Sequence, residues 1–457
     1  VAIRAVRAGR GRWVALFLLA ALCLPLALPD YSPLARLRLA WLDFYQLVLP
    51  RERISHPVVI VEIDERSLRR LGQWPWPRTR LAELIRRIGD AGATAIGLDM
   101  VMPEADQTSP EALIPRLDRG LSRAVEMLSA IPSNDARLAA TIKRYPVVLG
   151  VAGDDAITNI DNAILIVKNP LVVEGGGLEG RIRSYPQTLA SLPRLQEAAS
   201  GQGILNVDLE RGVLRRVPLV TTDGTVALPA LALELVRVAR GASAITVHVG
   251  DDAVSSVAVD GLKVPIQPDG QMWIHFSRIA PDRYLSALDV LQSDPASDAL
   301  REHLAGKIAL VGITGLAMVG RRVDPRGETI PGTDVHAQMI ESFHDRRFLR
   351  RPPWMPGAEA VSLVLLGGLL IWTVPGMRRH RALFMITATI ALSVVLGFAL
   401  FVTTGLLFDS AGLAVALFVI FSSLVVSALA QADHDRRMSQ RSLRAAREAA
   451  ARVAGEL

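Results

Sequence analysis

Hydrophobic positions are concentrated in four runs, which the sequence predicts to be membrane helices. The runs cover residues 13–28, 358–374, 382–407 and 410–430, and their interiors carry no Asp, Glu, Lys, Arg or His. A helix needs about 20 apolar residues to cross the hydrocarbon core. The last three runs reach or approach this length, whereas the first is shorter and is either a signal anchor or a cleaved signal peptide. We expect it to be retained as an anchor.

Arginines beside the runs predict the orientation of the chain, because Lys and Arg collect on the cytoplasmic side of membrane helices. They precede the first run, fill the link between the second and third runs, and follow the fourth run. The residues are Arg4, Arg7, Arg10, Arg12, Arg378, Arg379, Arg381, Arg436, Arg437, Arg441 and Arg444. The N-terminus, this link and the tail should therefore be cytoplasmic, which places the long middle segment outside.

The middle segment alternates between strand and helix patterns. Residues 58–64 form a run rich in β-branched residues, which is typical of a strand buried on both faces of a parallel sheet. A helical period follows at 81–88, and strands at 95–99 and 147–151 flank a helix at 138–145. Later strands are predicted at 213–220, 245–249, 254–259, 272–276 and 307–313, and later helices at 228–239 and 333–348. The fold class is therefore α/β: an exported parallel βαβ sheet with an α+β insertion, plus an α-helical membrane region of four spans.

Composition supports this mosaic and excludes several classes of protein. The 457 residues are 50% hydrophobic and 21% charged, which is too apolar for a soluble protein and too charged for membrane spans alone. The single cysteine excludes a disulfide framework and a cysteine-based zinc module. The net charge is +6, yet residues 31–350 carry 37 Lys and Arg against 38 Asp and Glu. The basic excess thus lies beside the spans, and we expect no nucleic-acid partner.

Five segments carry a family resemblance. They are IDERSLRRLGQWPWPR at 63–78, GLD at 97–99, GVLRRVPL at 212–219, GKIALVG at 306–312 and PGTDVHAQ at 331–338. In their order and intervals they resemble the type-two CHASE domain, the cyclase/histidine-kinase-associated sensory extracellular domain. The resemblance covers roughly residues 31–355, and the layout of one span before the domain and three after it is also similar to that family.

The resemblance implies a bacterial receptor whose exported sensor is coupled to a cytoplasmic output: an adenylate or guanylate cyclase, a histidine kinase, or a cyclic-dinucleotide enzyme such as a diguanylate cyclase. It does not imply a particular ligand. Two departures from the family pattern warn against transferring a binding role to the edge of the sheet. Residues 102–106 lack an aromatic before their acidic pair, and Glu210-Arg211 stands where an acidic residue usually precedes Gly212.

Acidic residues follow the first two predicted strands. Asp64, Asp99, Glu104 and Asp106 could meet at the carboxyl ends of these strands, where paired carboxylates could hold a cation or an amine. The alternative is that they cap helices and are solvated in loops, and we favour it because sequence alone does not show that the two strands are adjacent.

Two tryptophans and an arginine lie between the first predicted strand and the second. Trp74, Trp76 and Arg78 could stack on a ligand or seal a dimer face, but we expect the two indoles to cover the base of the next helix. The glycine-rich segment 175–180 matches a dinucleotide-binding pattern, yet no helical period follows it, so we interpret it as a loop.

The tail after the fourth run has the spacing of a coiled coil. Apolar residues recur in a 3-4-3-4 pattern, which is that of a parallel dimer seam. They are Leu443, Ala446, Ala450, Val453 and Leu457. An amphipathic helix without a partner is the alternative.

These patterns predict seven segments. They are a cytoplasmic N-terminus at 1–12, a transmembrane anchor at 13–30, an extracytoplasmic sensor at 31–355, transmembrane helices at 356–376, 382–407 and 409–431, and a cytoplasmic signalling helix at 432–457. We predict a sensory receptor of the bacterial inner membrane, multi-pass and homodimeric, that receives a small-molecule or protein signal. No motif predicts a cofactor, a metal or a catalytic residue. The alternative is a membrane-tethered, metal-assisted hydrolase that uses the acidic strand ends.

Overall fold

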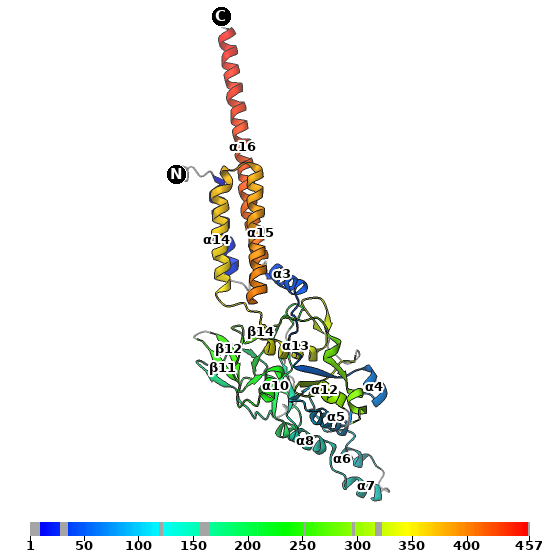
Figure 1. Cartoon of the computed structure of the whole chain (residues 1–457). Coiled ribbons are helices and arrows are strands. Elements are labelled where there is room, and N and C mark those ends of the chain that lie inside the picture. The colour runs from blue at the N-terminus through cyan, green and yellow to red at the C-terminus, as the bar shows by residue number, and fades with distance from the viewer. Residues whose placement is uncertain are drawn as a thin grey trace. The chain divides into compact units, whose positions relative to one another are not determined.

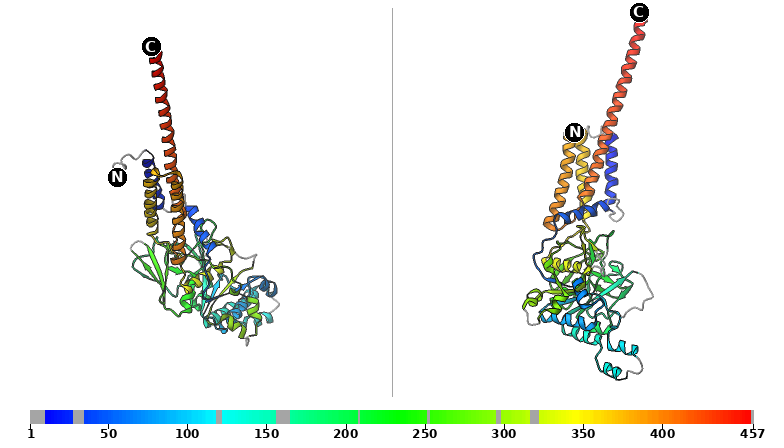
Figure 2. Two further views of the ribbon diagram at one scale, coloured as in Figure 1. Left: turned by 45° about the horizontal axis from the view of Figure 1, so that its top comes forward. Right: turned by 90° about the vertical axis from the view of Figure 1, so that its right-hand side faces the viewer.

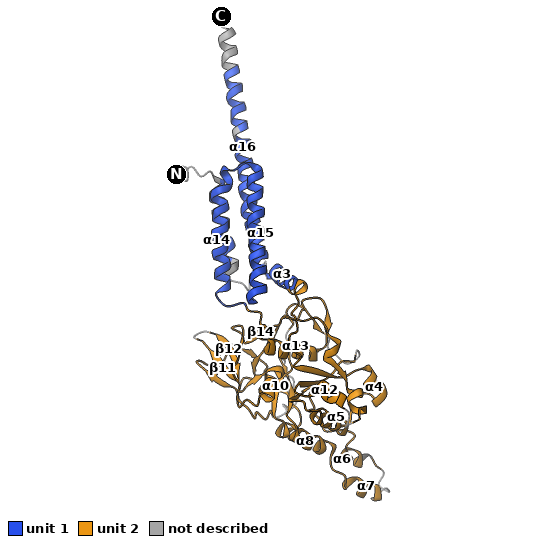
Figure 3. Ribbon diagram, viewed as in Figure 1, with its two compact units in different colours: residues 1–45, 351–457 blue, residues 46–350 orange. Residues whose placement is uncertain are grey.

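The computed structural model describes residues 10–27, 35–117, 122–155, 165–207, 209–250, 253–294, 298–315 and 322–455. The chain divides into two compact units (Figure 3). Residues 1–45 and 351–457 form one, which we call the helical unit, and residues 46–350 form the other, the α/β unit.

The helical unit is a bundle of long apolar helices. It contains α2 (Arg10–Ala27), α14 (Met355–Thr373), η4 (Val374–Gly376), α15 (Arg379–Thr404) and α16 (Ser410–Gly455). Helix α2 packs on α14 and α16, and α15 packs on α16 (Figures 1 and 2). Side chains such as Leu19, Leu363 and Ile420 share one apolar core.

Three helices of the described residues are long and apolar enough to cross a membrane. They are Met355–Gly376, Arg379–Thr404 and Ser410–Arg447, whereas Gly11–Leu24 is a shorter apolar helix. Three of the four predicted spans therefore have the required length and composition, and the first stays a prediction. Helix α16 continues without a break from its apolar part into the tail.

A further helix, α3 (Ala35–Val48), follows α2 and was not predicted. Its apolar residues alternate with Arg36, Arg38 and Asp43, so no long apolar run marks it in the sequence.

The α/β unit is built on a seven-stranded sheet with the order β15-β1-β16-β2-β3-β6, in which β7 also pairs with β3. The strands are β1 (Val58–Ile63), β2 (Ala95–Asp99), β3 (Val147–Asp154), β6 (Gln187–Leu189), β7 (Gly201–Ile204), β15 (Tyr284–Ser286) and β16 (Ile308–Ile313). Only the β3–β6 pairing in this sheet is antiparallel. The predicted late strand, β16, thus enters between β1 and β2.

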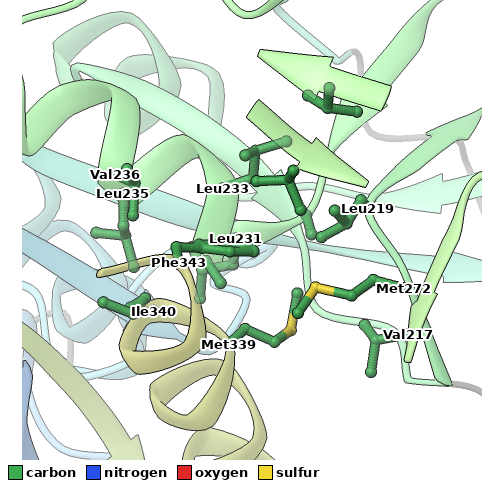
Figure 4. Packing of buried hydrophobic residues seen from close by; sticks show 14 of the residues in the cluster. Val217, Leu219, Leu231, Leu233, Leu235, Val236, Met272, Met339, Ile340 and Phe343 are labelled. Carbon is green, nitrogen blue, oxygen red and sulfur yellow. The ribbon is translucent and has the colours of Figure 1, made fainter. Parts of the chain in front are cut away.

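Helices cover both faces of this sheet. One face carries α4 (Glu65–Leu71), α5 (Arg78–Asp90), α8 (Asn134–Arg144), α9 (Pro193–Ala198), α11 (Ala287–Gln292) and α12 (Asp298–Leu304), and the other carries α10 (Leu231–Ala239) and α13 (Gly332–Asp345). Side chains alternate along β1, so Val58 and Ile60 enter the core of the second face while Val59 and Val61 enter that of the first. Burial on both faces explains the unbroken apolar run of β1. Figure 4 shows α10 and α13 meeting in the second core through Leu231, Leu235 and Phe343, among others.

The insertion is made of small sheets. Strands β4 (Val172–Glu174), β11 (Thr246–Val249), β12 (Val254–Val259) and β13 (Leu262–Pro265) form one, and β5 (Arg183–Ser184), β9 (Val220–Thr222) and β10 (Ala227–Pro229) form another. A further pair in the insertion is β8 (Arg216–Pro218) with β14 (Gln271–Trp273), and η3 (Pro281–Arg283) is a short helical segment. Before the insertion lie α6 (Pro110–Leu113), η2 (Ile114–Arg116) and α7 (Ser122–Ser129), and after it lies the pair of β17 (Arg322–Val323) with β18 (Thr329–Ile330).

Three predictions of the insertion need correction. The helix predicted at 228–239 begins at Leu231, because residues 227–229 form β10, which pairs with β9. The single strand predicted at 213–220 is two strands, because the chain leaves the β8–β14 pair at Pro218 and joins the β9 sheet at Val220. The strand predicted at 272–276 ends at Trp273.

Candidate functional site

The first two predicted acids lie at the expected edge of the sheet but are not on neighbouring strands. Asp64 follows β1 and Asp99 ends β2, and β16 pairs with both strands from the position between them. Two strand spacings of about 4.8 Å separate these strands by roughly 10 Å. Asp64 caps α4 by accepting a hydrogen bond from Ser67 N at 2.8 Å, and it also accepts one from Ser286 Oγ at 3.1 Å.

Asp99 lies at the first turn of α13. It accepts a hydrogen bond from Thr333 Oγ1 at 2.5 Å. His336, one turn further along α13, is 1% exposed, and burial lowers its pKa although the nearby Asp99 carboxylate opposes the shift. Asp99 is thus tied to α13 and not to Asp64.

Glu104, Asp106 and Arg78 are brought together in a second place. Asp106 accepts hydrogen bonds from Arg78 N at 2.8 Å and from Asn134 Nδ2 at 2.9 Å. Burial alone would raise the pKa of Asp106, but these and other hydrogen bonds outweigh it and lower the pKa. The Arg78 guanidinium lies 3.5 Å from Asp135 and donates to the Glu104 carbonyl oxygen at 3.2 Å. This network fixes the segment after β2 to the starts of α5 and α8.

The two indoles lie against the same part of the unit. Trp76 is 2% exposed and donates from Nε1 to the Gly72 carbonyl oxygen at 2.8 Å. Trp74 packs against the core beside it, with ring centroids 6.2 Å apart. Arg80 covers the Trp76 ring at 5.5 Å. Trp76 is therefore part of the core over α5.

Asp64 lines an open hollow of about 460 Å³ at the ends of β1 and β15. The hollow is lined by Glu62, Asp64, Arg66, Pro281, Tyr284, Leu285, Ser286 and Asp289. Arg66 pairs with Asp289 at 3.1 Å, and Glu62 accepts a hydrogen bond from Thr314 Oγ1 at 2.8 Å. Burial raises the pKa of Glu62. Of the predicted ligand residues, only Asp64 lines this hollow.

A buried group of charges lies behind β15 and was not predicted. Arg283 donates from Nη1 to Asp334 at 2.5 Å and from Nε to Glu341 at 3.0 Å, and all three side chains are fully buried. Tyr284, which lines the hollow, donates its hydroxyl proton to Asp334 at 2.9 Å. Burial and the Asp334 carboxylate both raise the pKa of this phenol. One strand segment therefore connects the hollow with the buried charges.

The same charges hold the segment by which the chain enters the α/β unit. Arg51 donates to Glu341 at 2.6 Å and to Asp345 at 3.0 Å, with both partners buried. Arg53 donates to Glu341 at 3.0 Å. We call this set, Arg51, Arg53, Arg283, Asp334, Glu341 and Asp345, the charge clamp. It fastens the incoming segment to α13, the last helix before the chain leaves the unit at Arg350.

The sequence does carry a signal for the clamp. Asp334, Gln338, Glu341 and Asp345 recur in a 4-3-4 pattern, which places them on one face of α13. A polar stripe on a helix predicted to close an apolar core indicates buried ionic partners, although it cannot identify them.

Glu359 of α14 was not predicted to have a role. It is the second residue of the run 358–374, at the edge of the uncharged interior of that run. It is buried and forms a two-pronged ion pair with Arg351, at 2.7 and 2.9 Å. Among the described residues, no three His, Cys, Asp or Glu side chains are grouped so that they could hold a metal ion. The predicted coiled-coil residues lie in the tail of α16. Leu443 and Ala446 are exposed, whereas the side chains of Ala450 and Val453 and the whole of Leu457 lie outside the described residues.

Comparison with known proteins gives one match, to a family model. No curated protein and no solved structure matches the chain. The family model of the CHASE2 domain, however, matches residues 14–376, which is most of the chain and includes the whole α/β unit. This match confirms the resemblance carried by the five sequence segments. The chain therefore belongs to the CHASE2 domain family, a family of sensory extracellular domains.

Proposed function

We propose that this protein is a membrane-anchored sensory receptor whose α/β unit lies outside the cytoplasm and passes a signal through the apolar helices to a cytoplasmic output. The charge clamp is the observation that carries the proposal. It joins η3, which immediately precedes β15, to the incoming segment and α13. Along the chain, the incoming segment follows α3, and α13 precedes α14. A change at the hollow beside Tyr284 would thus reach both connections to the helical unit.

Buried ion pairs suit such a role because they have few alternative arrangements. Removing one partner leaves an unpaired charge in a medium of low polarity, so the group tends to move as one body or to rearrange completely. The hollow, with Glu62 and Asp64 at its edge, is the proposed place of signal recognition, and its carboxylates favour a cationic or amine ligand.

The proposed orientation follows from the arginines beside the apolar helices. The N-terminus and the tail of α16 would be in the cytoplasm of a bacterium and the protein in its inner membrane. Reporter fusions test this orientation. After Gly201, a reporter enzyme that works only outside the cytoplasm should be active, and one that works only in the cytoplasm should be inactive. After His434, the opposite result is expected. The reverse pattern of reporter activity would refute the proposal that the protein is a receptor.

Signal transfer can be tested separately. A cyclase output fused after Leu457 would report the state of the chain in cells. Arg53→Ala removes a clamp cation that is 10% exposed, and we expect it to change the output at an unchanged amount of protein in the membrane. Arg86→Ala, which breaks an exposed pair with Glu83, is the matched control. Equal output from both variants and the parent would contradict a role of the clamp in signalling.

A further inference from the structure

Helix α3 leaves one apolar face uncovered. Leu37 is 40% and Phe44 is 45% exposed, and Trp41 lies between them on the same side. Their spacing of four and three residues places the three side chains in one stripe. The opposite face of the helix, with Leu39 and Leu42, is buried. A helix with two apolar faces needs a second apolar environment for the exposed one.

Hydrogen bonds fix α3 to the start of α16. Trp41 donates from Nε1 to Ser410 Oγ at 2.9 Å, and the Tyr45 hydroxyl is bonded to the same oxygen at 2.6 Å. The Tyr45 ring also packs on α15, with centroid distances of 5.8 Å to Phe398 and 5.2 Å to Phe401. These contacts all lie within the helical unit.

The contact residues mark the ends of two candidate spans. Ser410 is the first residue of α16, and Phe401 is one turn before the end of α15. Helix α3 is therefore held at the level where these spans leave the hydrocarbon core. Indole and phenol side chains prefer this level, because one end of the ring is apolar and the other forms hydrogen bonds.

The surface beside α3 is also apolar. Val402 of α15 is 51% exposed and Val395, two turns deeper, is 64% exposed. Both valines lie on the helix that the Tyr45 ring of α3 contacts. Arg36 near the start of α3 is exposed and long enough to reach lipid headgroups.

We infer that α3 is an interfacial helix whose Leu37, Trp41 and Phe44 side chains insert into the outer leaflet, at the boundary between headgroups and acyl chains. Its partner is the lipid surface. The inference rests on the membrane placement proposed above. Because Arg51 follows the end of α3 by three residues, a change in the depth or tilt of α3 would act on the charge clamp through the chain itself.

Depth-dependent quenching tests the inference in the full-length chain. Single cysteines would be introduced by Leu37→Cys, Phe44→Cys, Val395→Cys and Glu302→Cys in a Cys23→Ser background, and each would be labelled with a small fluorophore. The labelled chains are placed in vesicles of phosphatidylcholine and phosphatidylglycerol. Part of the phosphatidylcholine is brominated, either near the headgroup or near the end of the acyl chain.

We expect the probes at positions 37 and 44 to lose most of their fluorescence with bromine near the headgroup and little with deep bromine. The probe at 395, in a candidate span, should respond to deep bromine. The probe at 302, exposed on α12 of the α/β unit, should respond only to aqueous iodide.

Three other results are distinguishable. Iodide quenching at 37 and 44 equal to that at 302 would show that the stripe faces water, and it would overturn the inference. Protection from both quenchers together with disulfide cross-linking at 37 or 44 would show a second copy of the chain on this face, which also overturns it. Failure of the probe at 395 to respond to lipid would instead refute the membrane placement.

Discussion

Arg283 donates a hydrogen bond to Asp334 across 2.5 Å, and neither side chain is exposed to solvent. The Asp334 and Glu341 carboxylates outweigh the effect of burial and raise the pKa of the guanidinium, so Arg283 stays charged. Arg283 is the clamp cation that pairs with Asp334, whereas Glu341 is also bonded to Arg51 and Arg53. The loss of Arg283 should therefore leave Asp334 without its counter-charge and weaken the network around Glu341.

Arg283→Met should therefore destabilise the protein strongly. We expect the free energy of unfolding to fall by about 3–5 kcal/mol, because the buried Asp334 carboxylate loses the guanidinium that pairs with it and Glu341 loses one of three arginine partners. Denaturant unfolding of the full chain in detergent measures this change. Arg86→Ala breaks a pair in which both side chains are more than a third exposed, and its cost should be at most about 1 kcal/mol. Similar losses in the two variants would mean that the clamp is not a buried network.

A glycine in β7 provides a test of the packing of α10 on the sheet. A Cβ atom at Gly203 would lie 2.5 Å from Leu231 Cα, whereas one at Gly177 would meet no atom within 4 Å. Gly203→Ala should destabilise the protein by about 1–3 kcal/mol, since the backbone of α10 must shift away from the sheet. Gly177→Ala should change stability by less than about 0.5 kcal/mol. Equal thermal stability of the two variants would contradict the close approach of α10.

Much of the α/β unit was predictable because local patterns determine its elements. Residues 58–63 read as a strand because both faces of β1 are buried, and the helical period at 81–88 belongs to α5, which has one buried face. The order of the strands was not predictable. Strand β16 follows β2 by more than 200 residues yet lies beside it, and no local period encodes such a neighbour.

The same difference between local and distant contacts holds for the candidate site. Arg78 and Asp106 were both predicted as candidate site residues but in separate groups, and the structure brings them together across only 28 residues of sequence. The charge clamp joins Arg51 to Glu341 across almost the whole unit. Its polar stripe on α13 was visible in the sequence, but its partners could be known only from the fold.

The cap of α4 allows a test of how much Asp64 contributes to stability. Asp64→Ala removes the hydrogen bonds from Ser67 N and Ser286 Oγ, and it should lower the free energy of unfolding by about 1–2 kcal/mol. Asp64→Asn can still cap the helix and should cost less. If both variants are as stable as the parent, the carboxylate is not a structural cap and is free to serve the hollow.

Stability should also depend on pH through His275. Burial and the positive charges of Arg51 and Arg347 lower the pKa of His275 to about 4, although a hydrogen bond to the Leu49 carbonyl oxygen opposes the shift. In the unfolded chain the pKa is near 6.5. The unfolded state therefore binds the proton first, so the contribution of His275 is complete above pH 6.5 and is lost as the pH falls toward 4.

His275→Gln should reduce this acid-induced loss by about 1–2 kcal/mol between pH 7 and pH 4.5. Unfolding of the full chain in detergent at several pH values measures the difference. The raised pKa values of Glu62 and Glu234 act in the opposite direction, but they are common to parent and variant and cancel in the comparison. His303→Gln, on the exposed side of α12, is the control. Parallel pH profiles for the parent and His275→Gln would refute the role of His275.

The last prediction concerns the tail of α16, where Leu443 and Ala446 are exposed in the single chain. Exposed residues in a 3-4-3-4 pattern can associate with a second copy as a parallel coiled coil. In a Cys23→Ser background, a cysteine at Ala446 should cross-link two chains in detergent, and adding Val453→Glu with Leu457→Glu should greatly reduce the cross-linking, because like charges would then face each other across the seam. Arg447→Glu, beside the seam, should leave it unchanged. Undiminished cross-linking in the double variant would place the association in the apolar helices or the α/β unit, and the tail would then not be the dimer contact.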